Sequence, residues 1–204
     1  MNTTVFPDKF DKLFQISFGL TSIELEYLKK HFKPKRLQRN EYLIKAGEVS
    51  KQKTYIHNGC TRTYQVDAKG NEHTILFSFE DYWIGDIESY YTGLPAKNNV
   101  QALEPCELLI IQKDHFSKLE EDIPKLKKWY TEKVLKHHLA NLHQLTDTKL
   151  LSVEERYLKL LSKHPEIFQR VSQRHIANYL DIAPPSLSRL RARISKQCKS
   201  TLIY

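Results

Sequence analysis

Apolar residues recur at helical spacing near both ends of this chain and at the spacing of short strands between them. Residues 8–33 carry two groups of apolar side chains on repeating faces, which predicts helical structure. From about residue 35 to residue 112, short runs rich in Tyr, Ile, Val, Thr and Phe alternate with turn residues. Many short strands at regular spacing predict an antiparallel jelly roll. The expected strands are residues 41–44, 53–57, 60–66, 73–79, 99–102 and 106–111, with a hairpin turn at 67–70.

A long helix is predicted after the strands, from residue 123 to about residue 151, with Pro124 in its first turn. At about 1.5 Å per residue it would extend for about 40 Å, which is more than a small β-domain covers on one side. An uncovered apolar face commonly packs against a partner helix, so we predict a homodimer through this segment. The alternative is a helix that packs wholly within one chain. The apolar positions, which lie on more than one face, are Trp129, Val134, Leu135, Leu139, Leu142 and Leu145.

Residues 172–194 predict two short helices joined by a tight turn. Ser172 is a good N-cap residue, Asp181 tolerates the left-handed backbone of a turn, and Pro184 suits a first helical position. The spacing of the apolar residues predicts one inward stripe on the second helix, beside two polar stripes. The inward stripe is Leu187, Leu190 and Ile194, and the polar stripes are Ser186, Arg189 and Arg193, and Ser188, Arg191 and Ser195.

A helix pair of this kind can place its second helix in the major groove of DNA, where arginine recognises the edge of guanine. The alternative interpretation is a solvated cationic helix at the end of a small helical bundle. The charge distribution favours a polyanionic partner, because residues 150–204 contain ten Lys and Arg but four Asp and Glu. Residues 1–149 contain twenty-two Lys and Arg and twenty Asp and Glu, so most of the net charge of +8 lies in the segment that holds the helix pair. We therefore expect double-stranded DNA as the partner.

A membrane surface is the competing polyanion, but the N-terminus shows no lipidation signal and no basic amphipathic anchor. No signal peptide and no run of about twenty apolar residues is found, so we expect a cytoplasmic protein that does not associate with membranes. Cys60, Cys106 and Cys198 form no C-x-x-C pair, which argues against a zinc site or a disulfide framework. The histidines, including His137, His138 and His143, lack metal-chelating spacing. No catalytic motif is recognisable, so we expect no enzyme activity and no cofactor.

The order of a β-domain, a long helix and a helix-turn-helix resembles the Crp/Fnr family of bacterial transcription regulators. The resemblance rests on Gly47, residues 55–59, 70–72 and 83–86 and Phe79 in the β-domain, and on residues 170–180 and 186–191 near the C-terminus. It implies an α+β protein with three parts. These are a cyclic-nucleotide-binding-like jelly roll at 1–120, a dimerisation helix at 121–150 and a winged helix-turn-helix at 151–204.

The resemblance also implies roles for individual residues. Arg189 would occupy a position that contacts DNA bases, with Ser186 and Ser188 beside it. Ser172 and Arg174 would contact phosphates. Weaker assignments to phosphate are Arg191, Arg193 and Lys196. Pro185 stands where relatives often have Glu, and Ala183 where they have a capping Ser, so the DNA sequence recognised cannot be taken from a relative.

In the β-domain, the candidate effector pocket is Gly85, Asp86, Ala96 and Lys97. The resemblance implies that members binding cyclic nucleotides use a Gly-Glu pair and an arginine that clamps the phosphate. Here Asp86 follows Gly85, and Ala96 stands at about the arginine position with Lys97 beside it. Lysine lacks the bidentate geometry of arginine, so we expect no response to cyclic AMP. An iron–sulfur cluster is not expected either, because no cysteine occurs among the first 59 residues.

The sequence thus predicts a dimeric, sequence-specific DNA-binding transcription regulator. The alternative is a small-molecule sensor or interaction module whose basic C-terminal domain does not bind specific DNA. The β-domain could bind an effector, which the sequence does not identify, or it could serve as a dimer scaffold or as a contact for RNA polymerase.

Overall fold

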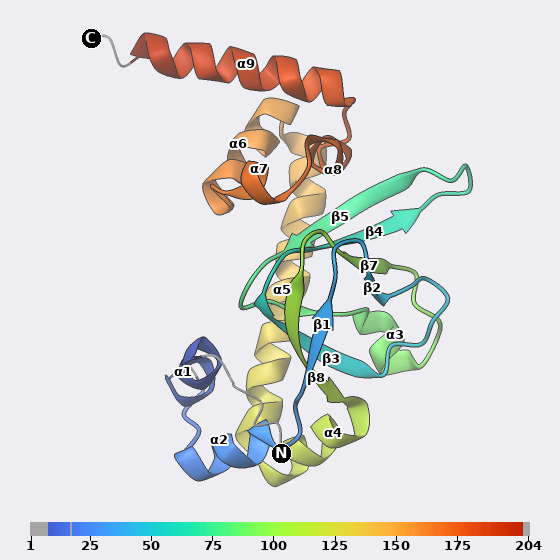
Figure 1. Cartoon of the computed structure of the whole chain (residues 1–204), viewed down its shortest axis with the longest axis vertical. Coiled ribbons are helices and arrows are strands. Elements are labelled where there is room, and N and C mark those ends of the chain that lie inside the picture. The colour runs from blue at the N-terminus through green and yellow to red at the C-terminus, as the bar shows by residue number, and fades with distance from the viewer. Residues whose placement is uncertain (1–7, 17, 202–204) are drawn as a thin grey trace.

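The computed structural model describes residues 8–16 and 18–201, without the side chains of residues 137, 138, 141 and 197–201. The side chains of His137, His138 and Cys198 therefore lie outside the described residues. A β-domain occupies the middle of the molecule, one long helix runs along its side, and a helical unit lies at the far end (Figure 1).

The β-domain consists of two four-stranded antiparallel sheets, which confirms the predicted jelly roll. One sheet has the order β1-β8-β3-β6 and the other β2-β7-β4-β5. The strands are β1 Lys33–Leu37, β2 Tyr42–Ile44, β3 Gln52–Asn58, β4 Thr61–Val66, β5 Glu72–Ser78, β6 Trp83–Ile84, β7 Asn99–Ala102 and β8 Cys106–Gln112.

All six predicted strands are present, whereas β1 and β6 were not predicted. β1 has the sequence Lys-Pro-Lys-Arg-Leu, in which only Leu37 is buried, so its apolar pattern is too weak to indicate a strand. It pairs with β8 along its whole length. β6 has two residues and forms because Thr54 and Tyr55 of β3 pair with it.

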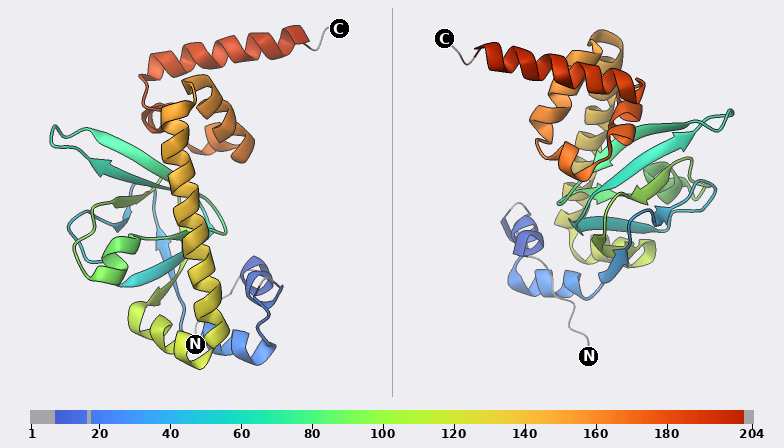
Figure 2. Two further views of the ribbon diagram at one scale, coloured as in Figure 1. Left: turned by 180° about the vertical axis from the view of Figure 1, so that it is seen from behind. Right: turned by 45° about the horizontal axis from the view of Figure 1, so that its top comes forward.

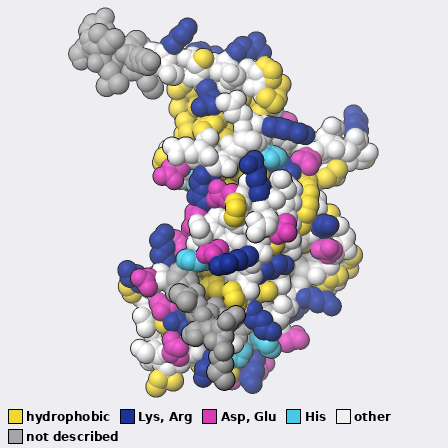
Figure 3. Space-filling model, viewed as in Figure 1, with side chains coloured by type: hydrophobic (Ala, Val, Ile, Leu, Met, Phe, Trp, Pro, Cys, Tyr) yellow, Lys and Arg dark blue, Asp and Glu magenta, His cyan; other side chains and the backbone are white. Residues whose placement is uncertain are grey.

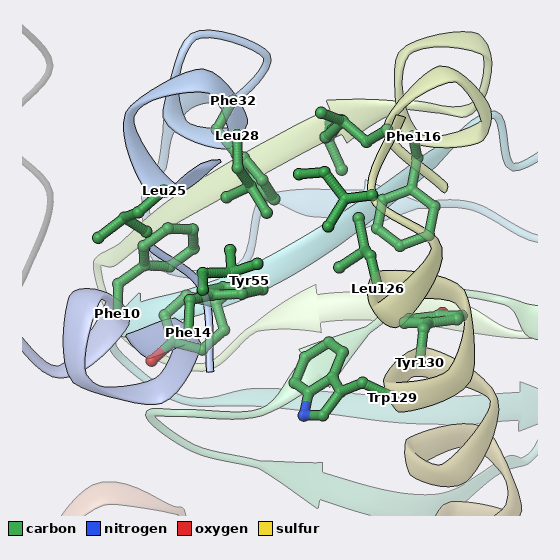
Figure 4. Packing of buried hydrophobic residues seen from close by; sticks show 14 of the residues in the cluster. Phe10, Phe14, Leu25, Leu28, Phe32, Tyr55, Phe116, Leu126, Trp129 and Tyr130 are labelled. Atoms are coloured by element: carbon green, nitrogen blue, oxygen red, sulfur yellow. The ribbon is translucent and has the colours of Figure 1, made fainter. Parts of the chain in front are cut away.

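Two short helices form within residues 8–33, the stretch predicted to be helical. They are α1 Asp8–Ile16 and α2 Ser22–Lys29, separated at Gly19, whose φ is 67°. A capping box starts α2, since Thr21 accepts from the Glu24 N–H and the Glu24 carboxylate accepts from the Thr21 N–H. Both helices bury aromatic and aliphatic side chains against the β-domain and the start of the long helix (Figure 4).

The long helix is α5, Pro124–Leu150, and it begins at the predicted proline. Its first half is covered by its own chain, because Leu126, Trp129 and Tyr130 are buried in the aromatic cluster. Its second half leaves leucines exposed. Figure 2 shows the helix extending past the β-domain into the helical unit. Two further helices flank the sheets, α3 Ile87–Thr92 and α4 Lys113–Asp122.

The C-terminal unit contains α6 Val153–Lys163, α7 Ile167–Arg170, α8 Gln173–Tyr179 and α9 Pro184–Thr201. A capping box between Ser152 and Glu155 starts α6. The described residues from 153 to 201 form helices and loops only, so they supply no strands for the wing that the resemblance implies. Phe77 and Phe79 of the β-domain share a core with Leu160, Ile176 and Leu187 of this unit.

Candidate nucleic-acid interface

The helix-turn-helix forms where the sequence predicts it. The Ser172 hydroxyl accepts from the backbone N–H of His175 at 3.3 Å and caps α8. Asp181 has φ 57°, the left-handed conformation that the turn between the helices requires. The Ile182 N–H then donates to the Ala177 carbonyl, and α9 begins at Pro184. Short-range signals therefore determine this geometry.

Buried side chains fix which face of α9 is exposed. Leu187 is fully buried and Leu190 nearly so, and both pack in the same cluster as Ile176 and Leu180 of α8. Arg189 points away from this core and is exposed. Its guanidinium makes only 3.4 Å contacts, with the Pro185 carbonyl and the Ser186 hydroxyl, which leaves its donors available to another molecule.

The other predicted contact residues divide into two groups. Arg174 and Lys196 are exposed, and neither forms an ion pair within the described residues. Arg191 instead lies with its guanidinium carbon 4.0 Å from the centre of the Phe168 ring, and Arg193 pairs with Glu154 of α6. Both side chains therefore help to pack α9 against its own domain.

Ser186 is half-buried beside Arg189, whereas Ser188 is exposed and lies elsewhere on the helix. Ser188 borders a shallow groove together with Tyr157 and Arg191. Ser188 and Arg189 consequently face different surroundings. Of the two serines, only Ser186 lies on the same stripe of the helix as Arg189.

The exposed side of α9 is strongly basic. Residues 184–201 contain five Lys and Arg and no Asp or Glu. Figure 3 shows Lys and Arg side chains along the outer edge that this helix forms. A cationic helix face of this kind attracts a polyanion and releases its counterions.

Two residues that sequence analysis did not select join the helix-turn-helix to the sheet. The Asn178 side chain accepts from the Thr74 N–H at 2.6 Å and donates to the Glu72 carbonyl at 2.5 Å. It thereby continues the backbone hydrogen bonding of β5 at its open edge. The buried Arg62 donates to the Glu72 carboxylate at 2.7 Å and lies 3.1 Å from Nδ1 of His175.

Burial and the charge of Arg62 lower the pKa of His175 to about 4, so this ring is neutral near pH 7. Arg170 adds a further connection, since it pairs with both Glu80 and Glu104 of the β-domain. The local sequence pattern does not indicate the contacts between the sheet and the helical unit, because the partners lie 66 to 113 residues apart. The C-terminal helical unit is consequently held against the sheet by specific polar contacts.

The model for the cyclic nucleotide-binding domain matches residues 34–122. The fumarate and nitrate reduction regulatory protein of Vibrio cholerae is 25% identical over 195 residues, covering 89% of this chain and 76% of that protein. Electron transport regulator A of Shewanella oneidensis is 23% identical over 196 residues, with the same coverage.

These matches support a transcription regulator of the Crp/Fnr type. Among solved structures, the c-di-GMP-responsive global regulator CLP of Xanthomonas campestris has a TM-score of 0.69 at 17% identity, covering 87% of this chain and 93% of that one. FixK2 of Bradyrhizobium japonicum has a TM-score of 0.66 at 15% identity, covering 81% of this chain and 85% of that one. These structures show the same fold.

The candidate effector pocket is only partly assembled as predicted. Gly85 and Asp86 line a cavity between the β-domain and α5. Ala96 is instead buried in an apolar cluster, and Lys97 is exposed and pairs with Glu88 at 2.8 Å. Neither Ala96 nor Lys97 lines the cavity. Lys53 does line the cavity but was not predicted, because it belongs to no recognisable sequence motif.

The described residues do not fit a resident metal or an iron–sulfur cluster. They contain no group of three or more His, Cys, Asp or Glu side chains placed to hold a metal ion. Cys60 and Cys106 are buried, and burial raises the pKa of Cys106 to about 11, which keeps that thiol protonated. In the described part of the chain, no helix is both long enough and apolar enough to cross a membrane.

Proposed function

We propose that this chain is a homodimeric, sequence-specific DNA-binding transcription regulator of the Crp/Fnr type that does not respond to cyclic AMP. One observation carries the DNA-binding part: Arg189 projects from a helix whose leucines are buried in the domain core. Arginine in this position can donate two parallel hydrogen bonds to guanine in the major groove. The relatives reported above are regulatory proteins rather than enzymes.

Exposed leucines on the second half of α5 support the homodimer. A row of large apolar side chains in solvent is unfavourable, and a second copy of the same helix would cover it. A two-fold dimer would present two copies of α9 to successive major grooves, about 34 Å apart on DNA. The leucines, with their exposed fractions, are Leu135 at 56%, Leu139 at 46%, Leu142 at 45% and Leu145 at 63%.

The β-domain argues against cyclic AMP as the effector. The position expected to clamp the phosphate holds buried Ala96, and both oxygens of Asp86 are engaged by groups of the protein itself. Without arginine the main charge-assisted contact to phosphate is lost. The remaining roles of this domain are to bind an effector other than cyclic AMP or to contact RNA polymerase.

DNA titration monitored by fluorescence anisotropy tests the proposed function. A specific fragment selected from genomic DNA and a random fragment are compared across a salt series, with and without cyclic AMP. Arg189→Ala should weaken specific binding by about 1–3 kcal/mol and relax base preference at one position. Arg36→Ala removes an arginine that is 81% exposed on β1, far from α9 in the sequence, and should leave both affinities unchanged.

Three results would contradict the proposal. The absence of DNA binding, or binding that does not depend on salt, would favour the interaction module. If Arg189→Ala lost the same binding free energy on specific and on random DNA, Arg189 would contact phosphate alone. A change in affinity on adding cyclic AMP would show that the altered pocket still binds it.

A further inference from the structure

A second cavity lies where the long helix enters the C-terminal helical unit, a junction that Figure 2 shows. Its volume is about 230 Å³, and its walls come from β5, the second half of α5, α6 and α8. Of its lining residues, only Leu76 also lines the cavity beside Asp86, so the two cavities are distinct. The apolar side chains in its walls are Leu76, Phe77, Ala140, Leu160, Tyr179 and Leu180.

Arg156 of α6 is the unusual group in this cavity. The side chain is half-buried, and its Nε is buried without a hydrogen-bond partner among the described residues. Its guanidinium forms no ion pair with any of those residues either. Buried donors are almost always paired in folded proteins, so an unpaired guanidinium N–H beside a cavity indicates that an acceptor is missing there.

The charge of the cavity is positive. Arg156, Lys159 and Lys163 supply three positive charges to its walls, and the carboxylate of Asp147 supplies one negative charge. Asp147 forms its ion pair with Lys159, at 2.5 Å. Lys163 is exposed and has no ion-pair partner within the described part of the chain. Leaving the histidines aside, two positive charges stay uncompensated, and a concave site with one sign of charge attracts the opposite sign.

Neutral hydrogen-bond donors complete the polar part of the walls. Burial raises the pKa of Tyr179, and Asp147 raises it further, so the phenol keeps its proton. Burial and the charge of Lys163 lower the pKa of His164 to about 4, so this ring is neutral near pH 7. It stacks on Phe79 with the ring centres 4.4 Å apart, which fixes its plane. A phenol and a neutral imidazole can each donate one hydrogen bond to an oxyanion.

The proposed dimer would leave this wall of α5 free. With 3.6 residues per turn, Ala140, Gln144 and Asp147 lie on the side of the helix away from Leu135 and Leu142. A second copy packed on the exposed leucines would therefore contact the opposite side of α5. The cavity stays accessible to a ligand whether or not the chain dimerises there.

We propose that this cavity binds a small organic oxyanion, a carboxylate or a phosphate, through the guanidinium of Arg156. The Nε and one Nη of arginine present two parallel donors, which match two oxygens of such a group. The apolar body of the ligand would pack against Phe77 and Leu160. A bound anion would contact both β5 and the helical unit, and any effect on DNA affinity rests on the proposed function. Binding is measured without DNA, so its failure and the failure of DNA binding are distinguishable.

Isothermal titration calorimetry of the full chain tests this step with two probes of nearly the same shape. Benzoate carries one negative charge, and benzamide carries none. We expect benzoate to bind about tenfold or more tighter than benzamide, as for a charge-assisted hydrogen bond. Phenyl phosphate is a second anion with the same ring, and the tighter of the two anions identifies the acidic group that the site prefers. Arg156→Gln should remove the preference for either anion over benzamide.

Arg36→Gln is the matched control, because Arg36 is 81% exposed on β1 and lines neither cavity, so it should keep the preference. Lys53→Met alters the cavity beside Asp86 and should keep it too. Equal affinity of the wild-type protein for the anions and benzamide would overturn the proposal. An unchanged preference in Arg156→Gln, or its loss in Lys53→Met, would also do so. If Arg156→Gln does not fold, Arg156→Lys keeps the charge without the paired donors and should weaken anion binding several-fold.

Discussion

Replacing Lys53 by methionine should stabilise the free protein, although it removes a residue of the folded core. Burial lowers the pKa of Lys53 from an ordinary value of 10.5 to about 7. At about 1.4 kcal/mol for each tenfold change in proton affinity, the charged form costs the folded state roughly 4 kcal/mol at pH 7. The surrounding rings return about 1–2 kcal/mol through cation–π contact.

Methionine keeps the length of the lysine stem without its charge. Lys53→Met should therefore raise the free energy of unfolding by about 2 kcal/mol at pH 7, measured by urea denaturation. The gain exists because burial removes water from the Lys53 ammonium and no ion pair within the described residues compensates for that loss. Lys51→Met changes an exposed side chain and should stay within about 0.5 kcal/mol of the wild-type protein.

The pH dependence gives this prediction its sharpest test. In the folded state Lys53 loses its proton near pH 7, whereas in the unfolded state it keeps it up to about pH 10.5. Its destabilising effect is thus complete below pH 7 and disappears as the pH rises toward 10.5. The advantage of Lys53→Met should shrink by about 2 kcal/mol between pH 7 and pH 9.

The titratable groups that face Lys53 do not reproduce this difference, because they are the same in both proteins. They are Tyr90 and Tyr91 of α3, Lys113 and Glu120 of α4, and Tyr130 of α5. A Lys53→Met protein less stable than the wild type at pH 7, or a difference that does not change with pH, would refute the reasoning.

Two further predictions concern the surfaces that join the parts of the molecule. Leu139→Glu, on the exposed row of α5, should raise the dimer dissociation constant at least about 100-fold in sedimentation equilibrium, because each of the two chains loses about 1.5 kcal/mol of apolar burial. Leu158→Glu, at a similarly exposed leucine on α6, is the control and should leave the dissociation constant unchanged. An unchanged dimer in Leu139→Glu would place the interface elsewhere. Asn178→Ala leaves the Thr74 N–H and the Glu72 carbonyl without their side-chain partner, so it should lower the free energy of unfolding by about 1–3 kcal/mol in urea denaturation. Asn58→Ala, at an exposed strand end, is the control and should leave that free energy unchanged. Wild-type stability in Asn178→Ala would show that this contact does not hold the helix-turn-helix to the sheet.

The sequence by itself determined the elements that depend on neighbours along the chain. Ser172 caps its helix, Asp181 adopts the left-handed turn, and Pro184 begins α9, each as predicted. These features require only residues within a few positions of one another. The same local periodicity placed Leu187 in the core and Arg189 outside it.

Only the tertiary structure decided which residues distant in sequence contact each other. Arg191 and Arg193 share the charge pattern of Arg189, but in the folded chain Arg191 lies over the Phe168 ring and Arg193 pairs with Glu154. Ala96 and Lys97 lie near Asp86 in sequence, yet a loop turns one into an apolar cluster and the other toward Glu88.

Lys53 shows the physical reason most clearly. Within its strand it is one lysine among polar and apolar neighbours, and its sequence carries no sign of burial. It becomes a buried, unpaired ammonium because α3, α4 and α5 bring Tyr90, Phe116 and Tyr130 around it. Burial and desolvation arise from packing between segments far apart in the chain, and the pattern of one segment cannot encode them.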